Sequence, residues 1–539
     1  MTSLFGLFLE FRPMALDADG KLYERLHTMQ SDVSVIYFDV PIGAGYSFTK
    51  DTSGYPHNLE HIAAEIAEFL GQFLLLFSEY TDRDFYVAGE SYGHSGPLFL
   101  TPLIEQKMYD EARAKSRVDL FAKKANAIAH SGFITVNKTV GSNMFFLYVQ
   151  AQQNPSTAPL VLWMQGGPGM TSLFGQFLEF GPLALDVDGK LYKRLHTMQS
   201  DVSVIYLDVP VGAGYSFTKD TSGYPHNLED IAAEIAEFLG QFLALFSEYT
   251  DRDFYVAGES YGVRSAVAIA YRLLTDQVKC VPLNLQGAAL GDGFMGSIFD
   301  VADSSEFLHQ VSMLTREGSD EFAKQFSTMR SLLAEDKGPE ALQILSQTAF
   351  ANPTQPTLFQ NLTLFNQQAS ALYSEIPAIM IKFYKYANST GLREAIHVGL
   401  DANFQATNQD LPTSLAFDFL RDITAEVELL LSASKMLVYM GQLDTLFPPT
   451  NQRAYLRSLN WSGASEYRSA PRDGWTASSG SDGISGYIVR ARNLAEAVVL
   501  GAGHYAALDK SDEVNYLIKN FISSSSRYHK PISACPLVP

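Results

Sequence analysis

Short apolar segments alternate with longer amphipathic segments along most of this chain. The amphipathic stretch from Asn227 to about Tyr249 predicts a helix, because apolar residues recur along one face and Asn227 can cap the start. Two more helices are predicted over Ala266–Leu274 and Asp509–Ile522. The apolar segments have the length of strands, and we expect strands at Met144–Gln150, Leu160–Met164, Val202–Leu207, Asp253–Ala257, Met436–Met440 and Ala497–Leu500.

This alternation predicts an α/β fold with a mostly parallel central sheet and helices on both faces. Between about Asp300 and Leu431, helical patterns dominate and strand patterns are few. We therefore interpret residues 300–431 as a helical cap inserted between two strands of the sheet. Residues 526–539 follow the last predicted helix and form a C-terminal tail.

The first part of the chain is written twice. Residues Met1–Gly93 match Met170–Gly262 at a constant offset of 169, with nine mismatches, and both copies end in Gly-Glu-Ser-Tyr-Gly. The first copy has two strands and one helix, which are too few to bury the apolar face of that helix. We therefore predict that residues 1–94 are an incomplete half-domain and that residues 95–525 form the complete domain. Two explanations of the first copy stay open: a remnant of an exon duplication or gene-model fusion, or a swapped or regulatory segment that packs on the second copy.

Composition and charge narrow the classes of function. A hydrophobic content of 46% and a charged content of 18% are typical of a globular chain with a sizeable core. The net charge of -20 argues against nucleic acid and anionic membranes as partners. No apolar run reaches the length of a membrane span, and no signal peptide is seen, because the opening residues recur in mid-chain at Thr171–Phe180. Cys280 and Cys535 allow at most one disulfide.

A candidate nucleophile follows the predicted strand Asp253–Ala257. Ser260 lies in the pattern Gly-x-Ser-x-Gly between this strand and a helix, which is the context of a nucleophile elbow. Asp444 and His504 each follow a predicted strand, and the order Ser…Asp…His is that of α/β-hydrolases. His504 would accept the proton of Ser260, and Asp444 would hold the imidazole and stabilise its cation. The sequence therefore predicts an α/β-hydrolase fold with a triad of Ser260, Asp444 and His504.

A glycine-rich turn supplies the donors that a tetrahedral intermediate needs. The turn Trp163–Gly169 follows a strand, and the backbone N–H groups of Gly167 and Tyr261 are the candidate oxyanion hole. In the first copy, Ser91 has no such turn before it and no Asp or His partner of its own, so we expect it to be inert. We expect neither a metal ion nor a cofactor.

Eight short segments, taken together and in order, resemble the serine carboxypeptidase family, and most of all its vitellogenic carboxypeptidase-like branch. They lie between about Leu98 and Ile522 and are Trp163–Gly169, Phe177–Pro182, Asp208–Phe217, Gly258–Tyr261, Gly291–Gly293, Ala395–Val398, Gly441–Asp444 and Gly501–His504. The resemblance implies an α/β-hydrolase fold and a serine-type carboxypeptidase that removes C-terminal residues from peptides or proteins at acidic pH.

The resemblance also implies roles for three more residues. In that family an amide residue and two glutamates bind the terminal carboxylate of the substrate, and they match Gln165, Glu179 and Glu259 here. Ionising both of two adjacent carboxyl groups is unfavourable, so the pair is expected to keep a proton at mildly acidic pH. Through this proton the pair can donate a hydrogen bond to the substrate carboxylate. A secretory route, lysosomal or secreted, is implied as well, and a homodimer is left open. Four Asn-x-Ser/Thr sites fit that route: Asn137, Asn361, Asn388 and Asn460.

Two segments depart from the family pattern. Gly262–Val267 stands where the family has Ala-Gly-Lys-Tyr-Val-Pro, and Tyr505–Ser511 stands where it has Met-Val-Pro-x-Asp-Gln-Pro. Both lie beside the nucleophile or the base, so they bear on turnover and on specificity. Two other functions stay open for this reason: a non-catalytic homologue that binds peptides or partners, and a serine carboxypeptidase-like esterase or acyltransferase.

Overall fold

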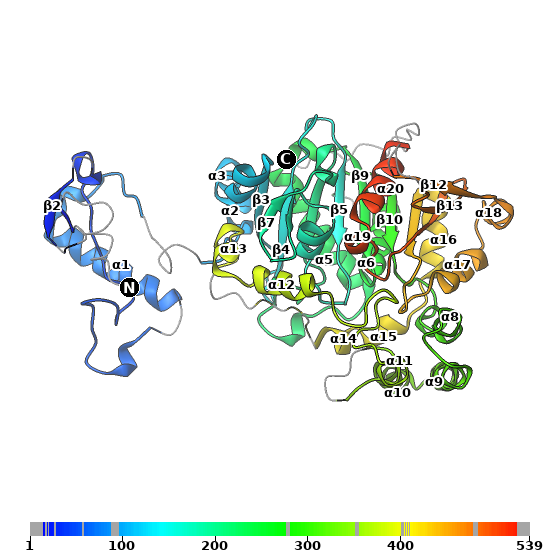
Figure 1. The fold of residues 1–539 in the computed structure, drawn as a ribbon. Coiled ribbons are helices and arrows are strands. Elements are labelled where there is room, and N and C mark those ends of the chain that lie inside the picture. The colour runs from blue at the N-terminus through cyan, green and yellow to red at the C-terminus, as the bar shows by residue number, and fades with distance from the viewer. Residues whose placement is uncertain are drawn as a thin grey trace. The chain divides into compact units, whose positions relative to one another are not determined.

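The computed structural model describes residues 14–16, 19, 21–25, 28–56, 59–87, 96–275, 281–350, 355–399, 404, 406, 408, 410–477 and 483–524. The chain divides into two units, Met1–Gly96 and Pro97–Pro539, and each is described by itself (Figure 1). Glu10 and Glu90, which match Glu179 and Glu259 in the first copy, lie outside the described residues. So do Ser91, both cysteines and the predicted tail at 526–539.

The larger unit is built on a 10-stranded sheet. In order across the sheet the strands are β12 (Arg472–Trp475), β13 (Gly486–Ala491), β14 (Leu494–Val499), β11 (Lys435–Gly441), β10 (Asn284–Gly291), β9 (Asp253–Glu259), β5 (Leu160–Met164), β8 (Ser203–Leu207), β4 (Ser142–Val149) and β3 (Ala129–Asn137). The strands from β14 to β8 run parallel, whereas the two outer strands at each edge are antiparallel to their neighbours. The mostly parallel sheet that the sequence predicts is therefore present.

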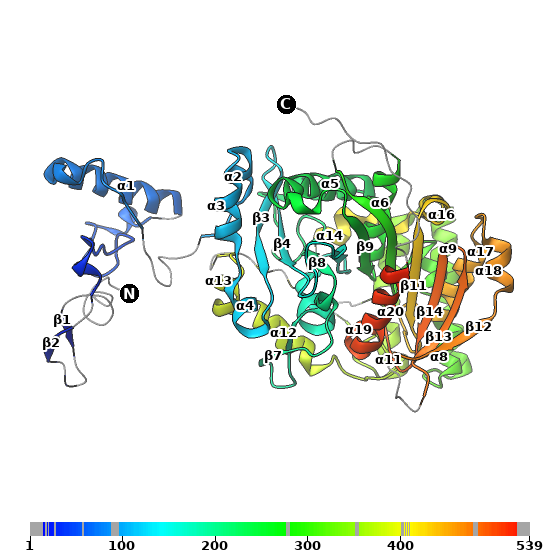
Figure 2. The same ribbon diagram turned by 90° about the horizontal axis from the view of Figure 1, so that it is seen from above.

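Helices cover both faces of the sheet, and each face carries its own apolar core (Figure 2). The helices on one face are α5 (Leu228–Leu245), α6 (Gly262–Leu274) and α16 (Thr424–Ala433), and those on the other include η6 (Gly175–Phe180), α19 (Ala506–Asp509) and α20 (Ser511–Ser524). Side chains of β9 alternate between the two cores, because successive residues of a strand point to opposite faces of the sheet. Val256 belongs to the core under α5 and α6, whereas Tyr255 and Ala257 belong to the core on the opposite face. At the start of α5, Asn227 accepts a hydrogen bond from the N–H of Asp230 at 2.8 Å, which is the predicted cap.

A long helical segment is inserted between β10 and β11. It contains α7 (Ile298–Val301), α8 (Ser305–Gln310), α9 (Arg316–Ala334), α10 (Gly338–Thr348), α11 (Leu358–Thr363), α12 (Ala378–Ala387), α13 (Thr390–Ala395), α14 (Asp410–Ser414), α15 (Ala416–Leu420) and α16. α9 packs on α8 and α10, and α10 packs on α15, so these helices form a cap at one end of the sheet (Figure 1). α12 packs instead on η6, and α16 packs on α6 and β11. The inserted segment thus supplies the cap and also helices of both covering layers.

The remaining described elements lie outside these layers or join them. They include α2 (Thr101–Glu105), α3 (Tyr109–Ser116) and α4 (Asp119–Ala125) before β3, the hairpin of β6 (Leu183–Leu185) and β7 (Leu191–Lys193), the short turns η7 (Met198–Ser200), η8 (Thr221–Gly223) and η9 (Ser247–Tyr249), and α17 (Pro449–Ser458) and α18 (Ala464–Ser469) after β11. No helix in the described part of the chain combines the length and the apolar character that crossing a membrane requires.

Every predicted strand is present: β5 has the predicted bounds Leu160–Met164, and the other five strands have shifted ends. Some elements nevertheless differ from the prediction. The hydrophobic pattern does not predict β10, because the strand is rich in small residues with low strand propensity. Close packing explains one of these small residues, since a Cβ on Gly287 would lie 2.8 Å from the ring of Phe521. The predicted helix Asp509–Ile522 is present as α20, but its first residue is Ser511, because Asp509 ends the short helix α19. Lys510 between them has φ −137° and ψ 58°, which are not helical angles.

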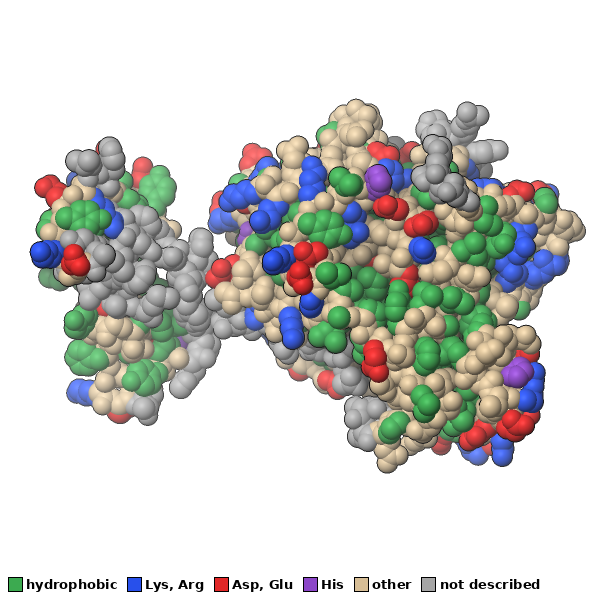
Figure 3. Space-filling model, viewed as in Figure 1, with side chains coloured by type: hydrophobic (Ala, Val, Ile, Leu, Met, Phe, Trp, Pro, Cys, Tyr) green, Lys and Arg blue, Asp and Glu red, His purple; other side chains and the backbone are tan. Residues whose placement is uncertain are grey.

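The smaller unit holds the first copy. Its described elements include a hairpin of β1 (Met14–Leu16) and β2 (Leu22–Glu24) and one helix, α1 (Leu59–Leu76). Many of its large apolar side chains are exposed, and Figure 3 shows hydrophobic side chains on the face of this unit that it views. The exposed residues include Tyr46, Phe48, Leu75, Leu76, Phe85, Tyr86 and Val87. Described residues of the first copy therefore do not enclose a closed core of their own.

Candidate active site

Five polar residues follow the carboxyl ends of neighbouring parallel strands. Gln165 follows β5, Ser260 follows β9, Asp292 follows β10, Asp444 follows β11 and His504 follows β14. These strands are adjacent in the order β14–β11–β10–β9–β5, so residues far apart in the sequence meet at one edge of the sheet.

Ser260 lies on a sharp turn between β9 and α6. Its φ is +57°, in the left-handed region that residues other than glycine rarely adopt, and its N–H donates to Gly291 O at 2.9 Å. The turn can close because two neighbours are glycines. A Cβ on Gly258 would lie 2.3 Å from Gly262 O, and a Cβ on Gly262 would lie 2.2 Å from Met164 O. The geometry is that of a strained strand-to-helix elbow.

His504 links the two other residues of the predicted triad. Its Nε2 lies 3.0 Å from Ser260 Oγ, and its Nδ1 lies 2.9 Å from Asp444 Oδ2. The second oxygen of Asp444 accepts the backbone N–H groups of Leu446 at 2.8 Å and Phe447 at 2.9 Å, so this carboxylate is fixed. His504 is 2% exposed and Asp444 is 0% exposed. The structure thus brings Asp444, His504 and Ser260 into one continuous chain of hydrogen bonds.

The surroundings of His504 decide the pKa of its imidazole and which ring nitrogen carries the proton. Burial acts to lower the pKa of its imidazole, but the charge and the hydrogen bond of Asp444 and the charge of Glu259 outweigh burial, and the pKa is raised above 6.5. A proton on Nδ1 facing Asp444 leaves Nε2 free to accept the proton of Ser260. The rings of Phe447 and Tyr505 lie beside the imidazole, with centroids 5.3 Å and 5.2 Å away.

The glycine-rich turn lies against the elbow. A Cβ on Gly166 would be 2.6 Å from Ser260 Cβ and 2.9 Å from Tyr261 N, so only glycine allows this approach. Gly167 follows with a φ of +116°. Among the described residues, neither the N–H of Gly167 nor that of Tyr261 donates a hydrogen bond. Two unused backbone donors beside a serine hydroxyl are what an oxyanion hole requires.

The three residues predicted to read a carboxylate also lie together. Gln165 Nε2 donates to Glu259 Oε2 at 2.7 Å, and Trp163 Nε1 donates to Gln165 Oε1 at 3.0 Å, which fixes the orientation of the amide. Glu179 from η6 lies close enough to Glu259 for the two carboxyl groups to shift each other's pKa, and both glutamates are 0% exposed. No described donor reaches either oxygen of Glu179 or Oε1 of Glu259. A hydrogen bond between two carboxyl groups needs a proton on one of them.

Burial is the main reason that this pair holds a proton. It raises the pKa of Glu259 to about 7, although the hydrogen bond of Glu179, the charge of His504 and the hydrogen bond of Gln165 act in the opposite direction. Burial, followed by the charge and the hydrogen bond of Glu259, raises the pKa of Glu179 well above its usual range. The proton belongs to the pair rather than to either residue.

Sequence reasoning missed two buried groups next to this pair. Asp292 accepts the N–H of Gly441 at 2.6 Å, and burial together with the charges of Asp444 and Glu259 raises its pKa well above the usual range. The hydroxyl of Tyr439 is buried against Gly291, where a Cβ would lie 2.4 Å from it. Asp292 could have been found from its place after a parallel strand, had the pattern predicted β10.

The two segments that depart from the family pattern are both well packed. Arg264, in α6 behind the nucleophile, is buried and forms an ion pair with Asp418 of α15 at 3.4 Å. Near the base, Asp509 Oδ2 accepts the N–H of Gly503 at 2.7 Å, and the ring of Tyr505 lies beside His504. Neither segment displaces Ser260 or His504 from their mutual hydrogen bond.

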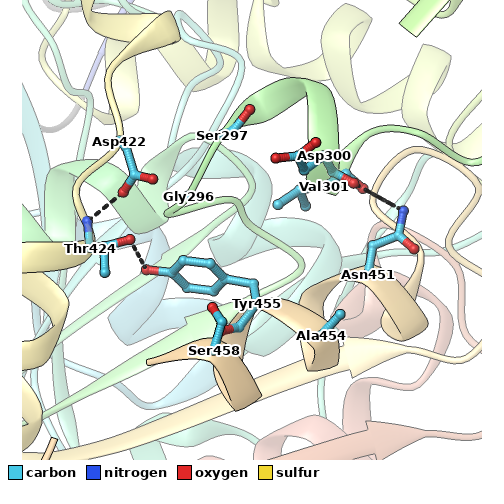
Figure 4. Close-up of a pocket in the computed structure, with 10 residues that line it drawn as sticks. All are labelled: Gly296, Ser297, Asp300, Val301, Asp422, Thr424, Asn451, Ala454, Tyr455 and Ser458. Carbon is cyan, nitrogen blue, oxygen red and sulfur yellow. Dashed lines mark hydrogen bonds between the residues drawn. The ribbon is translucent and has the colours of Figure 1, made fainter. Parts of the chain in front are cut away.

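A polar cleft of about 350 Å³ lies elsewhere, between the start of the cap, the start of α16 and α17 (Figure 4). None of the predicted site residues lines it. Its polar groups bond to one another: Asp422 accepts the N–H of Thr424 at 2.8 Å, and Thr424 Oγ1 donates to Tyr455 Oη at 3.2 Å. No cluster of His, Cys, Asp and Glu suited to a metal ion occurs within the described ranges.

The model of the serine carboxypeptidase family matches residues 1–120 and 119–524 of this chain. The venom serine carboxypeptidase of Apis mellifera is 34% identical over 432 residues, which are 79% of this chain and 90% of that protein. The probable serine carboxypeptidase CPVL of Homo sapiens is 34% identical over 433 residues, 80% of this chain and 90% of that protein. The vitellogenic carboxypeptidase of Aedes aegypti is 32% identical over 437 residues, again 80% and 90%.

A solved structure, that of the prohormone-processing carboxypeptidase Kex1(delta)p from Saccharomyces cerevisiae, superimposes with a TM-score of 0.64. The alignment covers 76% of this chain and 96% of that chain at 19% identity. A likeness at this level of identity concerns the fold, and the predicted α/β-hydrolase fold is confirmed.

Proposed function

The chain belongs to the serine carboxypeptidase family, as its motifs predict, and we propose that it removes C-terminal residues from peptides at acidic pH through Ser260, Asp444 and His504. Membership makes it a hydrolase that acts on peptides. The observation that carries the proposal is the pair of hydrogen bonds of His504, to Ser260 Oγ at 3.0 Å and to Asp444 Oδ2 at 2.9 Å.

Acylation follows from this geometry. His504 Nε2 accepts the proton of Ser260 while Oγ attacks the carbonyl carbon of the last peptide bond. The N–H groups of Gly167 and Tyr261 donate to the oxyanion that forms. Protonated His504, stabilised by Asp444, then gives its proton to the leaving nitrogen. The C–N bond breaks, and the C-terminal residue departs.

Deacylation uses the same groups in the reverse sense. His504 accepts a proton from water, and the water oxygen attacks the ester carbonyl of the acyl-enzyme. The ester bond to Ser260 Oγ breaks, His504 returns the proton to that oxygen, and the shortened peptide leaves with a new carboxyl group. Gly167 and Tyr261 stabilise this second oxyanion as they do the first.

Recognition of a free chain end rests on Gln165, Glu179 and Glu259. Below the raised pKa of the glutamate pair, its shared proton and the amide of Gln165 offer donors to the terminal carboxylate of the substrate. Above that pKa the pair loses a proton, and the additional negative charge repels the same carboxylate. The pair therefore accounts both for action at chain ends and for a preference for acidic pH.

We also propose that peptide or protein C-termini are the partners and that the chain follows a secretory route, lysosomal or secreted. The name of the Apis mellifera relative places that protein in venom. All four asparagines of the Asn-x-Ser/Thr sites are exposed on this chain, as glycan attachment requires.

The proposal is tested by labelling the full chain with a serine-directed organophosphonate and mapping the modified peptide. We expect the label on Ser260, with none on Ser91, and we expect Ser260→Ala to lose both the label and turnover by several orders of magnitude. A label on the Ser91 peptide, or turnover that survives in Ser260→Ala, would overturn the assignment.

A further inference from the structure

The acidic side chain of Asp418, on α15 of the cap, lies in the interior directly behind the nucleophile elbow. Its Oδ2 accepts the hydroxyl of Tyr261 at 3.1 Å, and its Oδ1 accepts the N–H of Leu228, the first residue of α5, also at 3.1 Å. Its side chain is 0% exposed. One carboxylate of the cap thus touches both the residue after the nucleophile and the start of a helix that covers the sheet.

Arg264 completes this cluster from the first turns of α6. Its Nη2 donates to the backbone oxygens of Asp418 at 2.7 Å and Arg421 at 3.0 Å and lies 3.4 Å from Asp418 Oδ2. Its Nε and Nη1 have no hydrogen-bond partner among the described residues, and the guanidinium faces the ring of Phe294 at 4.8 Å. Arg264 is fully buried, so Asp418 is the carboxylate on which its charge depends.

Tyr261 is held from two sides by the same cap segment. Besides the bond from its hydroxyl to Asp418, its ring stacks on that of Phe419, with centroids 5.9 Å apart and planes 8° apart. The side chain is therefore fixed at its tip and along its face. Because the backbone N–H of Tyr261 is one of the two unused donors beside Ser260, fixing this side chain also fixes a donor.

From this geometry we propose that Asp418 is a positioning residue that anchors Tyr261 and so ties the placement of the cap to the assembly of the oxyanion hole. Arg264 keeps Asp418 in place by pairing with it in the interior. The inference rests on the proposed function, because it assigns Asp418 a part in the same reaction. It also gives a role to the departure from the family pattern at Gly262–Val267, since Arg264 makes the connection to the cap.

The test compares variants of the full chain on one peptide. Tyr261→Phe removes only the hydroxyl and keeps both the ring and the backbone N–H. We expect kcat to fall about tenfold with KM within about twofold, since losing an oxyanion donor outright costs roughly 10²–10³ in kcat and a displaced donor costs less. The rate of organophosphonate inactivation should fall in parallel, because the tetrahedral adduct uses the same donors.

A second variant separates positioning from folding. Asp418→Asn alone leaves the charge of Arg264 buried without its counter-charge and should be destabilised. The double variant Arg264→Met with Asp418→Leu removes both charges and should have a higher denaturation midpoint than Asp418→Asn, although the hydroxyl of Tyr261 and the N–H of Leu228 lose their acceptor. Its kcat should still be reduced about tenfold or more, because Tyr261 is no longer anchored. The matched control is Arg421→Ala, which removes partly exposed ion pairs on the same segment, keeps the backbone oxygen that Arg264 contacts, and should leave kcat and KM unchanged.

Full kcat in Tyr261→Phe, or in the folded double variant, would overturn the positioning role. An equal fall in kcat for Arg421→Ala would overturn it as well, because the effect would then belong to the whole segment. If the unaltered chain neither turns over a peptide nor reacts with the organophosphonate, the proposed function fails and this inference fails with it. If the unaltered chain does both and the variants match it, only this inference fails.

Discussion

The side-chain amide of Gln165 donates to Glu259 Oε2 at 2.7 Å, whereas no described donor reaches the other oxygen of that carboxyl group, Oε1. Oε1 is therefore the oxygen of Glu259 that stays available for a proton held in common with Glu179. The amide of Gln165 thus determines which oxygen of Glu259 can carry the proton that a substrate carboxylate would meet. The same pair also acts on the catalytic base, since the charge of ionised Glu259 is among the causes that raise the pKa of His504.

Activity is expected to depend on pH most strongly for substrates with a free C-terminus. As the pH rises through about 7, Glu259 loses its proton, the pair gains negative charge, and KM for a free-acid peptide should increase by about tenfold per pH unit. The same peptide as its amide has no carboxylate to repel, and its KM should stay nearly constant. Measuring KM against pH for both forms checks this; coincident curves would favour the esterase or acyltransferase reading.

Glu259→Gln is expected to separate the pH dependence of KM, which comes from the glutamate pair, from that of kcat, which comes from His504. The variant has no charge at residue 259, so KM for free-acid peptides should lose most of its pH dependence. The pKa of His504 should also fall, because one of the charges that raise it is gone, and the acidic limb of kcat should move to lower pH. Ser260 should still react with an organophosphonate. A steep KM profile in this variant would show that other groups read the carboxylate.

Stability is expected to fall from acidic to neutral pH. In the folded chain, burial raises the pKa of Glu259 to about 7, that of Asp208 to about 7 and that of Glu234 to about 8. These groups hold protons that the unfolded chain releases above about 4. Stability is therefore fully present below the unfolded pKa values and is lost as pH rises through the folded ones.

Urea denaturation of Ser260→Ala at pH 5 and pH 7.5 measures this difference without self-digestion. The free energy of unfolding should be several kcal/mol larger at pH 5. Adding Glu259→Gln should shrink the difference, because one titrating group is removed. Equal stabilities at the two pH values would contradict the raised pKa values.

The first copy is expected to be dispensable for catalysis. A chain that begins at Gly96 should fold and should keep kcat/KM within about twofold, because the residues of the candidate site all belong to the larger unit. The exposed side chains of the smaller unit, such as Phe85, Tyr86 and Val87, should make residues 1–95 the first target of limited proteolysis. Loss of folding or activity on truncation would support a swapped or regulatory role instead.

Gly166 is expected to tolerate no side chain. The Cβ of Gly166→Ala would lie 2.6 Å from Ser260 Cβ and 2.7 Å from Glu259 O, so the turn must move away from the elbow, and kcat/KM should fall by 10² or more, on the order of losing an oxyanion donor. The matched control is Gly240→Ala in α5, where a Cβ meets nothing within 4 Å. That change should raise stability by roughly 0.5–1 kcal/mol without affecting turnover.

Glycan attachment is expected when the chain is directed through the secretory route. Asn137, Asn361, Asn388 and Asn460 are all exposed, so each can reach a glycosylating enzyme. Expression behind a secretory leader should add mass that an endoglycosidase removes, and replacing all four asparagines by glutamine should abolish the added mass. An unglycosylated, active product from that route would contradict the proposed location.

Part of the fold could be predicted from the sequence because it depends on the local pattern of hydrophobic and polar residues. The periodicity of α5 and the cap at Asn227 predict that helix, and strand ends followed by Ser260, Asp444 and His504 predict where the site lies. The roles of Asp292, Tyr439 and Asp418 could not be predicted in this way. Their significance comes from neighbours that the sheet order and the folded cap bring to them from distant parts of the chain.

The duplication separates these two contributions within one molecule. Leu59–Leu76 and Leu228–Leu245 have nearly the same sequence, and both form helices of 18 residues, α1 and α5. The hairpins β1–β2 and β6–β7 likewise occur in both copies. Local hydrogen bonds close these elements, so the sequence by itself determined them.

Sheet strands and the core were decided by tertiary structure. Asp253–Glu259 forms β9 between β5 and β10, whereas residues 84–87, with the same sequence as 253–256, form no strand. Leu245 of α5 is 2% exposed, but its counterpart Leu76 of α1 is 78% exposed. A strand needs partners for its backbone groups and a helix needs a surface on which to bury its apolar face, and the rest of the domain supplies both only to the second copy.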